Sequence, residues 1–291
     1  MTDVFTFHKR FSSDEFDAQY NLRAGRPDYE ETVIPKWQQE SETARNNLKC
    51  RLDIRYGDAE KQKLDVFSCG EVSAPTLIYF HGGYWQRGDK SIYSFLATPF
   101  VVSGANVVVV GYDLCPAVTI TQISEEAREA IAFIWRNASE LGLNQKRLTV
   151  MGHSAGGHIT QMMMGTSWSQ YASDLPDDLI AAGILVSPLS YLEPVRLTQA
   201  LNAGIRMDPD EAERESPMIN HHPATNAPQI VAVGGAETGE FKRQAQMYVD
   251  AFATSERSIE LYHVPDVDHF DELTHLQIQK AFFQKLRALL G

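Results

Sequence analysis

The chain has 291 residues, of which 43% are hydrophobic and 22% charged, as in an ordinary globular protein. Its formal net charge of −12 at pH 7 argues against nucleic acid or an anionic membrane surface as a partner, because both attract basic patches. Three scattered cysteines, Cys50, Cys69 and Cys115, are too few for a disulfide framework or a zinc site. These features predict reduced thiols and a cytoplasmic location.

Residues 1–49 are polar and charged, with helix-like patches at 13–20 and 29–43. The start of this segment has no apolar stretch of the kind that signal peptides carry. No apolar run in the chain approaches the roughly 20 residues that cross a bilayer. Two alternating segments follow, 50–56 and 63–68, on either side of a Gly57-Asp58 turn, and this pattern predicts an antiparallel hairpin.

The pattern then changes to short, continuous apolar runs separated by helical stretches, which is typical of strands that are buried on both faces of a mostly parallel sheet. The predicted strands are 75–80, 106–112, 147–151, 180–186, 229–233 and 259–264. The predicted helices are 124–141, 156–165, 240–254 and 271–290. Alternating strands and helices predict an α/β fold with helices on both faces, formed by a single domain over residues 1–291.

One interval between predicted strands, residues 187–226, is longer than most crossovers and is interrupted by prolines. We expect it to contain one or two short helices and to form a small cap over the carboxyl edge of the sheet. Open α/β sheets bind their ligands at this edge.

The sequence Gly152-His153-Ser154-Ala155-Gly156 lies between a predicted strand and a predicted helix. It fits the G-x-S-x-G elbow, in which a strained turn presents a nucleophilic serine between small residues. The start of the helix after Ser154 also favours negative charge nearby. The alternative is that Ser154 only packs between strand and helix.

A second motif, HGGYW at residues 81–85, follows the first predicted parallel strand. The backbone N–H groups of Gly82 and Gly83 can turn towards an oxyanion without interference from a Cβ atom. With the N–H of Ala155 they would form an oxyanion hole. We interpret His81 as support for this loop rather than as a base.

The general base is predicted to be His269, which follows the last strand, because hydrolases of this architecture have the chain order Ser, acid, His. The other histidines near Ser154, His153 and His158, are interpreted as structural, with side chains that point away from it. The acid must follow the strand at 229–233, where Glu237 and Glu240 are the candidates. Glu237 is the expected acid, and Glu240 the alternative, since its position also suits the first turn of a helix.

Four stretches, HGGYW, YDLCP at 112–116, GHSAGGH at 152–158 and DHFDEL at 268–273, together resemble the arylformamidases, the kynurenine formamidase branch of the α/β-hydrolase superfamily. The wider superfamily includes hormone-sensitive-lipase-like esterases. The resemblance, which extends to DAQYN at 17–21, covers nearly the whole chain. It implies Ser154 as nucleophile, His269 as base and Glu237 as acid, and it implies hydrolysis of N-formyl-L-kynurenine.

The expected reaction is acyl transfer to water through a covalent intermediate on Ser154, without a metal or an organic cofactor. The expected substrate is a small aromatic amide or ester, and the aromatic residues Tyr20, Tyr84, Trp85 and Trp168 are predicted to bind it. A general carboxylesterase for small aryl or short-chain esters is the alternative, and an inactive binding protein is a third possibility. The oligomeric state stays open, with a homodimer among the alternatives, because the N-terminal segment could cover its own active site or that of a neighbour.

Overall fold

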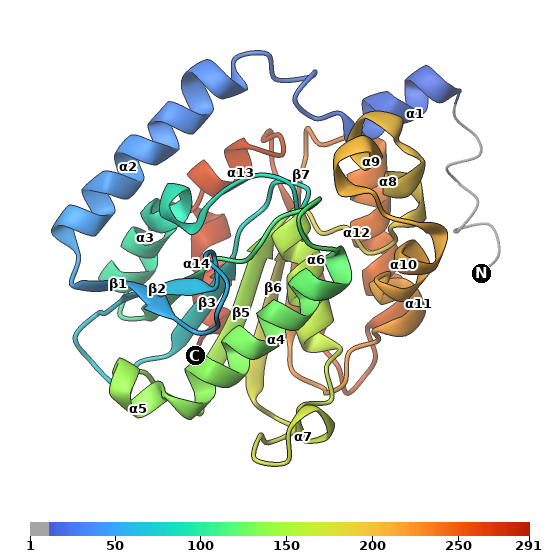
Figure 1. Ribbon diagram of the computed structural model, residues 1–291. Coiled ribbons are helices and arrows are strands. Elements are labelled where there is room, and N and C mark those ends of the chain that lie inside the picture. The colour runs from blue at the N-terminus through green and yellow to red at the C-terminus, as the bar shows by residue number, and fades with distance from the viewer. Residues whose placement is uncertain (1–11) are drawn as a thin grey trace.

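A computed structural model describes residues 12–291, so the first eleven residues, where the prediction of no signal peptide falls, lie outside the described part. Eight strands form one sheet in the order β1-β2-β4-β3-β5-β6-β7-β8 (Figure 1). β2 is antiparallel to both β1 and β4, and the pairs from β4 to β8 are parallel. The strands are β1 Cys50–Arg55, β2 Lys63–Phe67, β3 Thr76–Phe80, β4 Asn106–Val110, β5 Leu148–His153, β6 Ile180–Val186, β7 Gln229–Gly234 and β8 Ile259–Val264. The predicted hairpin and mostly parallel α/β sheet are confirmed.

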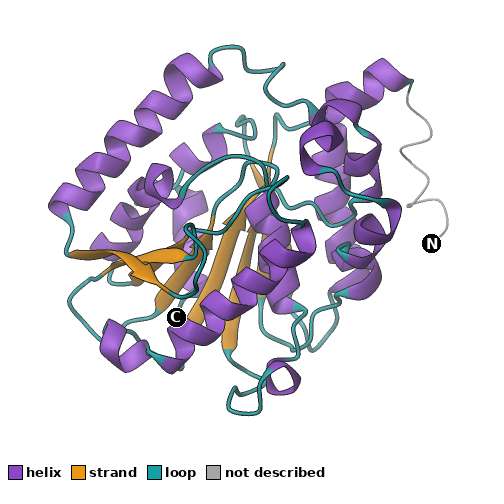
Figure 2. Cartoon of the chain, in the orientation of Figure 1, coloured by secondary structure: helices purple, strands orange, loops and turns teal. Residues whose placement is uncertain are grey.

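Helices cover both faces of this sheet (Figure 2). The longer ones are α1 Ser13–Tyr20, α2 Ile34–Asn47, α4 Ile120–Arg136, α6 Ala155–Met164, α12 Gly239–Phe252 and α14 Ala281–Leu289. The shorter ones are α3 Ala97–Val102, α5 Ala138–Leu141, α7 Trp168–Tyr171, α8 Glu193–Leu197, α9 Gln199–Ile205, α10 Pro209–Arg214, α11 Pro217–Asn220 and α13 Asp271–Thr274. A π-helical turn, η2 Tyr29–Val33, precedes α2, and a 3₁₀ helix, η3 Lys90–Leu96, precedes α3.

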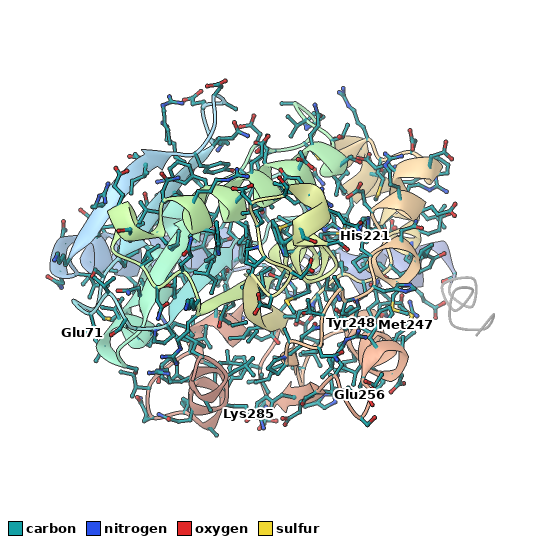
Figure 3. The ribbon with its side chains drawn as sticks, turned by 90° about the horizontal axis from the view of Figure 1, so that it is seen from below. Glu71, His221, Met247, Tyr248, Glu256 and Lys285 are labelled. Atoms are coloured by element: carbon teal, nitrogen blue, oxygen red, sulfur yellow. The ribbon has the colours of Figure 1, made fainter. Side chains whose placement is uncertain are left out.

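The side chains of the continuous apolar strands pack into two separate hydrophobic cores. Along β3, Ile78 and Phe80 belong to the core beneath α4, α6 and α12, whereas Leu77 and Tyr79 belong to the core beneath α2, α3 and α14. Because successive strand side chains point to opposite faces, a strand buried on both sides must be apolar at every position. In Figure 3 the green helix α4 and Lys285 of α14 lie on opposite sides of the sheet.

Three predicted segments differ from the structure. The predicted helix 124–141 begins earlier, at Ile120, and is divided at Asn137 into α4 and α5. The predicted last helix, 271–290, is divided into α13 and α14 by turns at 275–280. The interval 187–226 holds four short helices, α8 to α11, where one or two were expected. No helix in the described part of the chain is long and apolar enough to span a membrane.

Candidate active site

Ser154 lies in a sharp turn between β5 and α6. Its backbone angles, φ 58° and ψ −119°, are a conformation that a residue with a Cβ atom rarely adopts. The turn also brings backbones into close contact, because a Cβ atom added at Gly152 would lie 1.9 Å from the Gly156 carbonyl oxygen, and one at Gly156 would lie 2.0 Å from the Phe80 carbonyl oxygen. The glycines that flank Ser154 are therefore a steric requirement of the turn.

The loop after β3 lies against Ser154. A Cβ atom added at Gly82 would be 3.1 Å from the Ser154 Cβ, so this backbone passes directly beside the serine. Gly83 has φ 121°, and a Cβ atom there would lie 2.2 Å from the Arg87 carbonyl oxygen. Ala155 is the first residue of α6, where backbone N–H groups have no acceptor within the helix. Gly82 therefore lies beside Ser154, and Gly83 lines the same cavity as the serine.

His81 holds this loop from behind. Its ring is buried and stacks on the rings of Tyr93 and Tyr112, with centroids 5.4 and 4.2 Å away. Its Nδ1–H donates to the Gly82 carbonyl at 2.8 Å, and the Tyr112 hydroxyl donates to the His81 carbonyl at 2.6 Å. Burial lowers the pKa of His81 to about 4, so the ring stays neutral and acts as a support.

His269 and Glu237 form a buried pair. The Nδ1–H of His269 donates to Glu237 Oε1 at 2.8 Å, which leaves Nε2 of the same ring for another partner. The alternative acid, Glu240, accepts instead from Arg243 at 2.6 Å and from the Tyr20 hydroxyl at 2.7 Å. The structure therefore brings Glu237, and not Glu240, to the imidazole.

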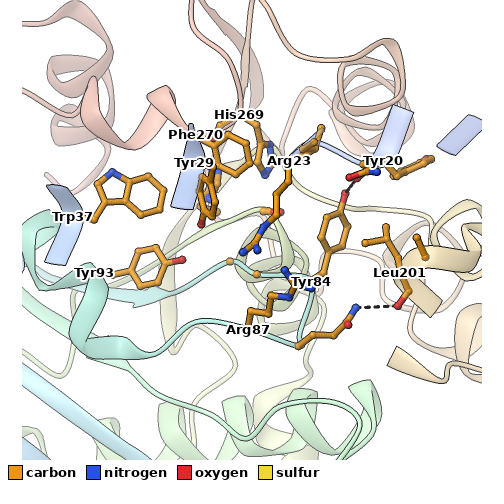
Figure 4. A pocket seen from close by; sticks show the side chains of 18 residues that line it. Tyr20, Arg23, Tyr29, Trp37, Tyr84, Arg87, Tyr93, Leu201, His269 and Phe270 are labelled. Atoms are coloured by element: carbon orange, nitrogen blue, oxygen red, sulfur yellow. Dashed lines mark hydrogen bonds between the residues drawn. The ribbon is translucent and has the colours of Figure 1, made fainter. Parts of the chain in front are cut away.

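Ser154 and His269 both line one cavity of about 170 Å³ at the carboxyl edge of the sheet (Figure 4). Aromatic rings form much of its wall, and Tyr29 packs on Phe270 with centroids 4.4 Å apart. Two guanidinium groups, of Arg23 and Arg87, also face the cavity, and no carboxylate lines it among the described residues. The lining comprises Tyr20, Asn21, Leu22, Arg23, Tyr29, Trp37, Gly82, Gly83, Tyr84, Gln86, Arg87, Tyr93, His153, Ser154, Ala200, Leu201, His269 and Phe270.

Of the four aromatic residues predicted to bind substrate, only Tyr20 and Tyr84 line the cavity. Trp85 is fully buried and packs edge-on against His158, with ring centroids 5.1 Å apart. Trp168 is in α7, which lies at the opposite end of the sheet from α9 and α13 (Figure 1). The prediction of substrate contacts is wrong for these two tryptophans, because both are core residues.

Within the described part of the N-terminal segment, residues 20–37 contribute to the cavity wall of their own chain. Tyr20, Arg23 and Tyr29 line the cavity, and the Tyr20 carbonyl accepts from the Tyr84 hydroxyl at 2.8 Å. Arg26 forms ion pairs with Asp268 at 2.6 Å and with Asp271 at 3.0 Å, on either side of His269. On the opposite rim, Gln86 donates to the Leu201 carbonyl of α9 at 3.0 Å. The cavity wall thus combines residues from distant parts of the chain.

His153 was interpreted as pointing away from the serine, but it lines the cavity beside the predicted base. Its ring centroid is 4.4 Å from that of His269, and its Nε2–H donates to the His269 carbonyl at 2.8 Å. Burial keeps the pKa of His153 well below its usual value, so the ring is a neutral brace. His158 is also buried, and its Nε2–H donates to the Glu215 carbonyl at 2.7 Å, in agreement with a structural role.

Potential ligand atoms of His153, His269 and Glu272 lie within 4.8 Å of one another, which is close enough for a metal ion. Each residue nevertheless has a hydrogen-bond partner of its own: the His269 carbonyl, Glu237 and Ser187 respectively. The arrangement favours proton chemistry over metal binding.

Four residues at or behind the cavity were not predicted from the sequence. They differ in how clearly the sequence around them marks a functional position. Arg23 and Arg87 are isolated cations in ordinary polar stretches, so nothing in the sequence marks them. Ser187 directly follows the apolar run of β6, as Ser154 follows that of β5, and it has φ 44°. Glu272 is a buried acid within the DHFDEL stretch. Its aromatic and apolar neighbours in the sequence were the one sign that this acid is buried.

Comparisons with known proteins agree with this geometry. Residues 77–271 match a family model described as alpha/beta hydrolase fold. The kynurenine formamidase of Danio rerio is 31% identical over 96% of each chain, and that of Salmo salar is 31% identical over 92% of each.

Two solved structures cover most of the chain. One, from Silicibacter sp. tm1040 and provisionally named a thioesterase, has 30% identity and a TM-score of 0.79, and it covers 95% of this chain and 98% of its own. A phosphonate-inhibited esterase B from Lactobacillus rhamnosis is 15% identical with a TM-score of 0.68, covers 91% of this chain and 95% of its own, and supports the fold alone. The chain is a hydrolase that belongs to the α/β-hydrolase fold family, in the group that includes the kynurenine formamidases.

Proposed function

We propose that this protein is an arylformamidase that removes the formyl group from an aromatic amide of the N-formylkynurenine type, using Ser154, His269 and Glu237. The observation that carries this proposal is the 2.8 Å hydrogen bond from His269 Nδ1 to Glu237, in a ring that shares one aromatic cavity with a strained serine. The names of the Danio rerio and Salmo salar relatives support the substrate class.

In the proposed reaction, Ser154 Oγ attacks the formyl carbon while His269 Nε2 accepts the hydroxyl proton. The Glu237 carboxylate orients the ring and stabilises the imidazolium, without taking the proton itself. His269 then gives the proton to the departing aromatic amine, and a formyl ester remains on Ser154. Water, activated by the same histidine, attacks this ester and releases formate.

The negative charge that develops on the formyl oxygen would be held by backbone N–H groups of Gly83 and Ala155, with Gly82 beside them. The loss of one such donor typically raises the barrier by about 3 kcal/mol. The tight contacts that hold Gly83 and the elbow in place support this role, because a useful oxyanion hole must be rigid before the charge forms.

The cavity also supports an anionic aromatic substrate. Rings of Tyr29, Trp37, Tyr93 and Phe270 line it, and both of its charged side chains are arginines. Guanidinium groups bind carboxylates well, because their donors match the spacing of the two oxygens. Arg23 already pairs with Glu30, so Arg87 is the proposed partner for a substrate carboxylate.

Two further features are proposals about the whole protein. We place it in the reducing cytoplasm, because all three cysteines are free thiols in the structure. A homodimer is the second proposal, which sedimentation at micromolar concentration tests directly.

A substrate panel tests the function. We expect kcat/KM to be highest for N-formylkynurenine and at least about tenfold lower for neutral formanilide, p-nitrophenyl acetate and a short-chain thioester, since only the first offers both a ring and a carboxylate. A preference for the p-nitrophenyl ester would make the protein a carboxylesterase, and a preference for the thioester would follow the name of the Silicibacter relative.

The matched control is Ser154→Ala, with folding verified by circular dichroism. This variant should lose turnover of every substrate in the panel and all labelling by a fluorophosphonate probe. Full activity in a folded Ser154→Ala protein would contradict the mechanism.

A further inference from the structure

We propose that Glu272 is a positioning residue, held as a neutral carboxylic acid, which fixes the Glu237 carboxylate against His269 through the hydroxyl of Ser187. The inference builds on the proposed triad, and it concerns the groups behind it. Glu272 and Ser187 are fully buried, and neither lines the cavity. They therefore act through Glu237 and not on the substrate.

The geometry centres on the Ser187 hydroxyl. Ser187 Oγ lies within hydrogen-bond distance of Glu237 Oε1, and it is 2.8 Å from Glu272 Oε2. Glu237 Oε1 also accepts from His269 Nδ1. One serine oxygen thus joins two buried carboxyl groups, of which the nearer to the imidazole is the proposed catalytic acid.

The protonation state of Glu272 follows from the number of protons available for these hydrogen bonds. A serine hydroxyl carries one proton, so it can donate to only one of two carboxylates. The second contact joins two oxygens and needs a proton from the carboxyl group. Glu237 Oε1 already accepts from His269 N–H, and a hydrogen bond of this kind favours a carboxylate over a carboxylic acid. We therefore assign the carboxyl proton to Glu272. The order is Glu272 O–H to Ser187 Oγ, Ser187 O–H to Glu237, and His269 N–H to Glu237.

The surrounding groups agree with a neutral Glu272. The groups that face it are Glu237 from the end of β7, His153 from the end of β5, and His269 and Asp268 from the loop before α13. The nearest side-chain cation candidate, His153 Nε2, is 3.6 Å away and donates to a carbonyl instead. The Gly234 backbone N–H acts the other way and lowers the pKa of Glu272, but burial outweighs it. Burial, and next the charge of Glu237, raise the pKa of Glu272 well above its usual value.

The backbone at Ser187 is a second, independent observation. Ser187 has φ 44°, and the backbone of a non-glycine residue in this region is strained. Its N–H is nevertheless fixed by the Ala232 carbonyl at 2.8 Å. Glycine would relieve the strain but would remove the hydroxyl that joins the two carboxyl groups. The strained serine is what the positioning role requires.

The test measures the pH profile of kcat/KM for p-nitrophenyl acetate, an activated ester that does not depend on the formamide proposal. Glu272→Gln keeps a neutral donor for Ser187, so we expect activity within about threefold of wild type and an acid-limb midpoint within about 0.2 pH units. An ionised Glu272 would stabilise the His269 imidazolium, and its removal would then lower the midpoint. A decrease of about half a unit or more would overturn the proposal.

Two variants that lack the donor give the opposite expectation. Glu272→Leu and Ser187→Gly should each reduce kcat by about tenfold or more at unchanged KM, as is usual when an orienting partner is lost. Ser187→Gly suits the backbone, so it keeps the test available if the leucine variant does not fold. Wild-type kcat in folded Ser187→Gly would overturn the positioning role.

A similar buried pair provides the control: Ser124 donates to Glu215 at 2.9 Å, outside the cavity. Glu215→Gln should leave kcat and the pH profile unchanged, which separates a local effect from the general effect of replacing a buried carboxyl group. Infrared difference spectra of wild type minus Glu272→Gln should show the carbonyl stretch of a protonated carboxylic acid, and carboxylate bands alone would overturn the assignment. Ser154→Ala in the same ester assay separates failure of the triad from failure of this proposal.

Discussion

Glu237 and Glu240 are three residues apart, yet their carboxylates have different partners, His269 and the Arg243–Tyr20 pair. Glu237→Gln should reduce kcat by about 10³-fold or more, because the amide no longer stabilises the imidazolium and favours the wrong ring tautomer. Steady-state kinetics on an activated ester measure this loss.

Glu240→Gln is the matched control for that prediction. It should change kcat by less than about threefold while lowering the melting temperature, because the partly buried Arg243 loses its ion pair with Glu240. If Glu240→Gln instead reduced kcat by the larger factor, the assignment of the acid would pass to Glu240.

Arg87 gives a prediction about substrate binding. Arg87→Met should raise the KM for N-formylkynurenine by about tenfold, since a charge-assisted contact is typically worth about 1.5 kcal/mol or more. The KM for neutral p-nitrophenyl acetate should not change. Arg55→Met, at an exposed arginine of the β1–β2 hairpin, is the control. An equal rise for both substrates would show that Arg87 does not recognise charge.

At the scale of elements, the contact between β3, β5 and α6 determines whether the elbow can form. Gly156→Ala would place a methyl group 2.0 Å from the Phe80 carbonyl oxygen, so the helix must move away from the sheet. We expect a loss of several kcal/mol in the free energy of unfolding, as in overpacked cores. Gly25→Ala, whose added Cβ atom would be 3.4 Å from its nearest neighbour, should cost less than about 1 kcal/mol. Urea unfolding of both variants checks the contrast.

The boundaries of the strands show why part of the fold could be predicted from the sequence. β6 begins and ends where its apolar run does, because burial on both faces leaves no polar positions inside the strand. No comparable pattern in the sequence marks the break between α13 and α14. Leu273, Leu276, Phe283 and Leu286 are all buried, and their spacing also fits one continuous helix.

Whether a site residue could be predicted likewise depends on whether the local sequence marks it. Ser154 and His269 could be predicted because each follows a recognisable strand in a motif with few alternatives. Ser187 and Glu272 could not, because their roles arise only when the ends of β6 and β7 and the start of α13 come together. Trp168 was misassigned since its ring is equally suited to a pocket and to a core.

For the whole molecule, buried histidines predict sensitivity to acid. Burial lowers the pKa of both His81 and His158 from 6.5 to about 4. The unfolded chain therefore binds more protons than the folded one between these values, and the stability present above pH 6.5 is lost as the pH falls towards 4. Each ring contributes up to about 3 kcal/mol to this loss.

Urea unfolding between pH 7.5 and 4.5 tests the expectation. The His158→Gln variant, which can still donate to the Glu215 carbonyl, should show a shallower fall than wild type over the same range. A stability that stayed constant from pH 7 to pH 5 in the wild type would show that these rings are not held neutral.

Residues 19–26 contact three loops that carry proposed catalytic residues: Tyr20 meets the HGGYW loop, Gln19 accepts from Thr238 near Glu237, and Arg26 pairs with Asp268 beside His269. The residues proposed to perform the bond cleavage all lie after residue 80, whereas six of the eighteen residues that line the cavity lie before residue 40. A third of the cavity wall is therefore formed by a stretch of chain separate from the proposed catalytic residues. Exchanging the first 40 residues between relatives is a direct way to transfer substrate preference while the residues proposed for hydrolysis stay unchanged.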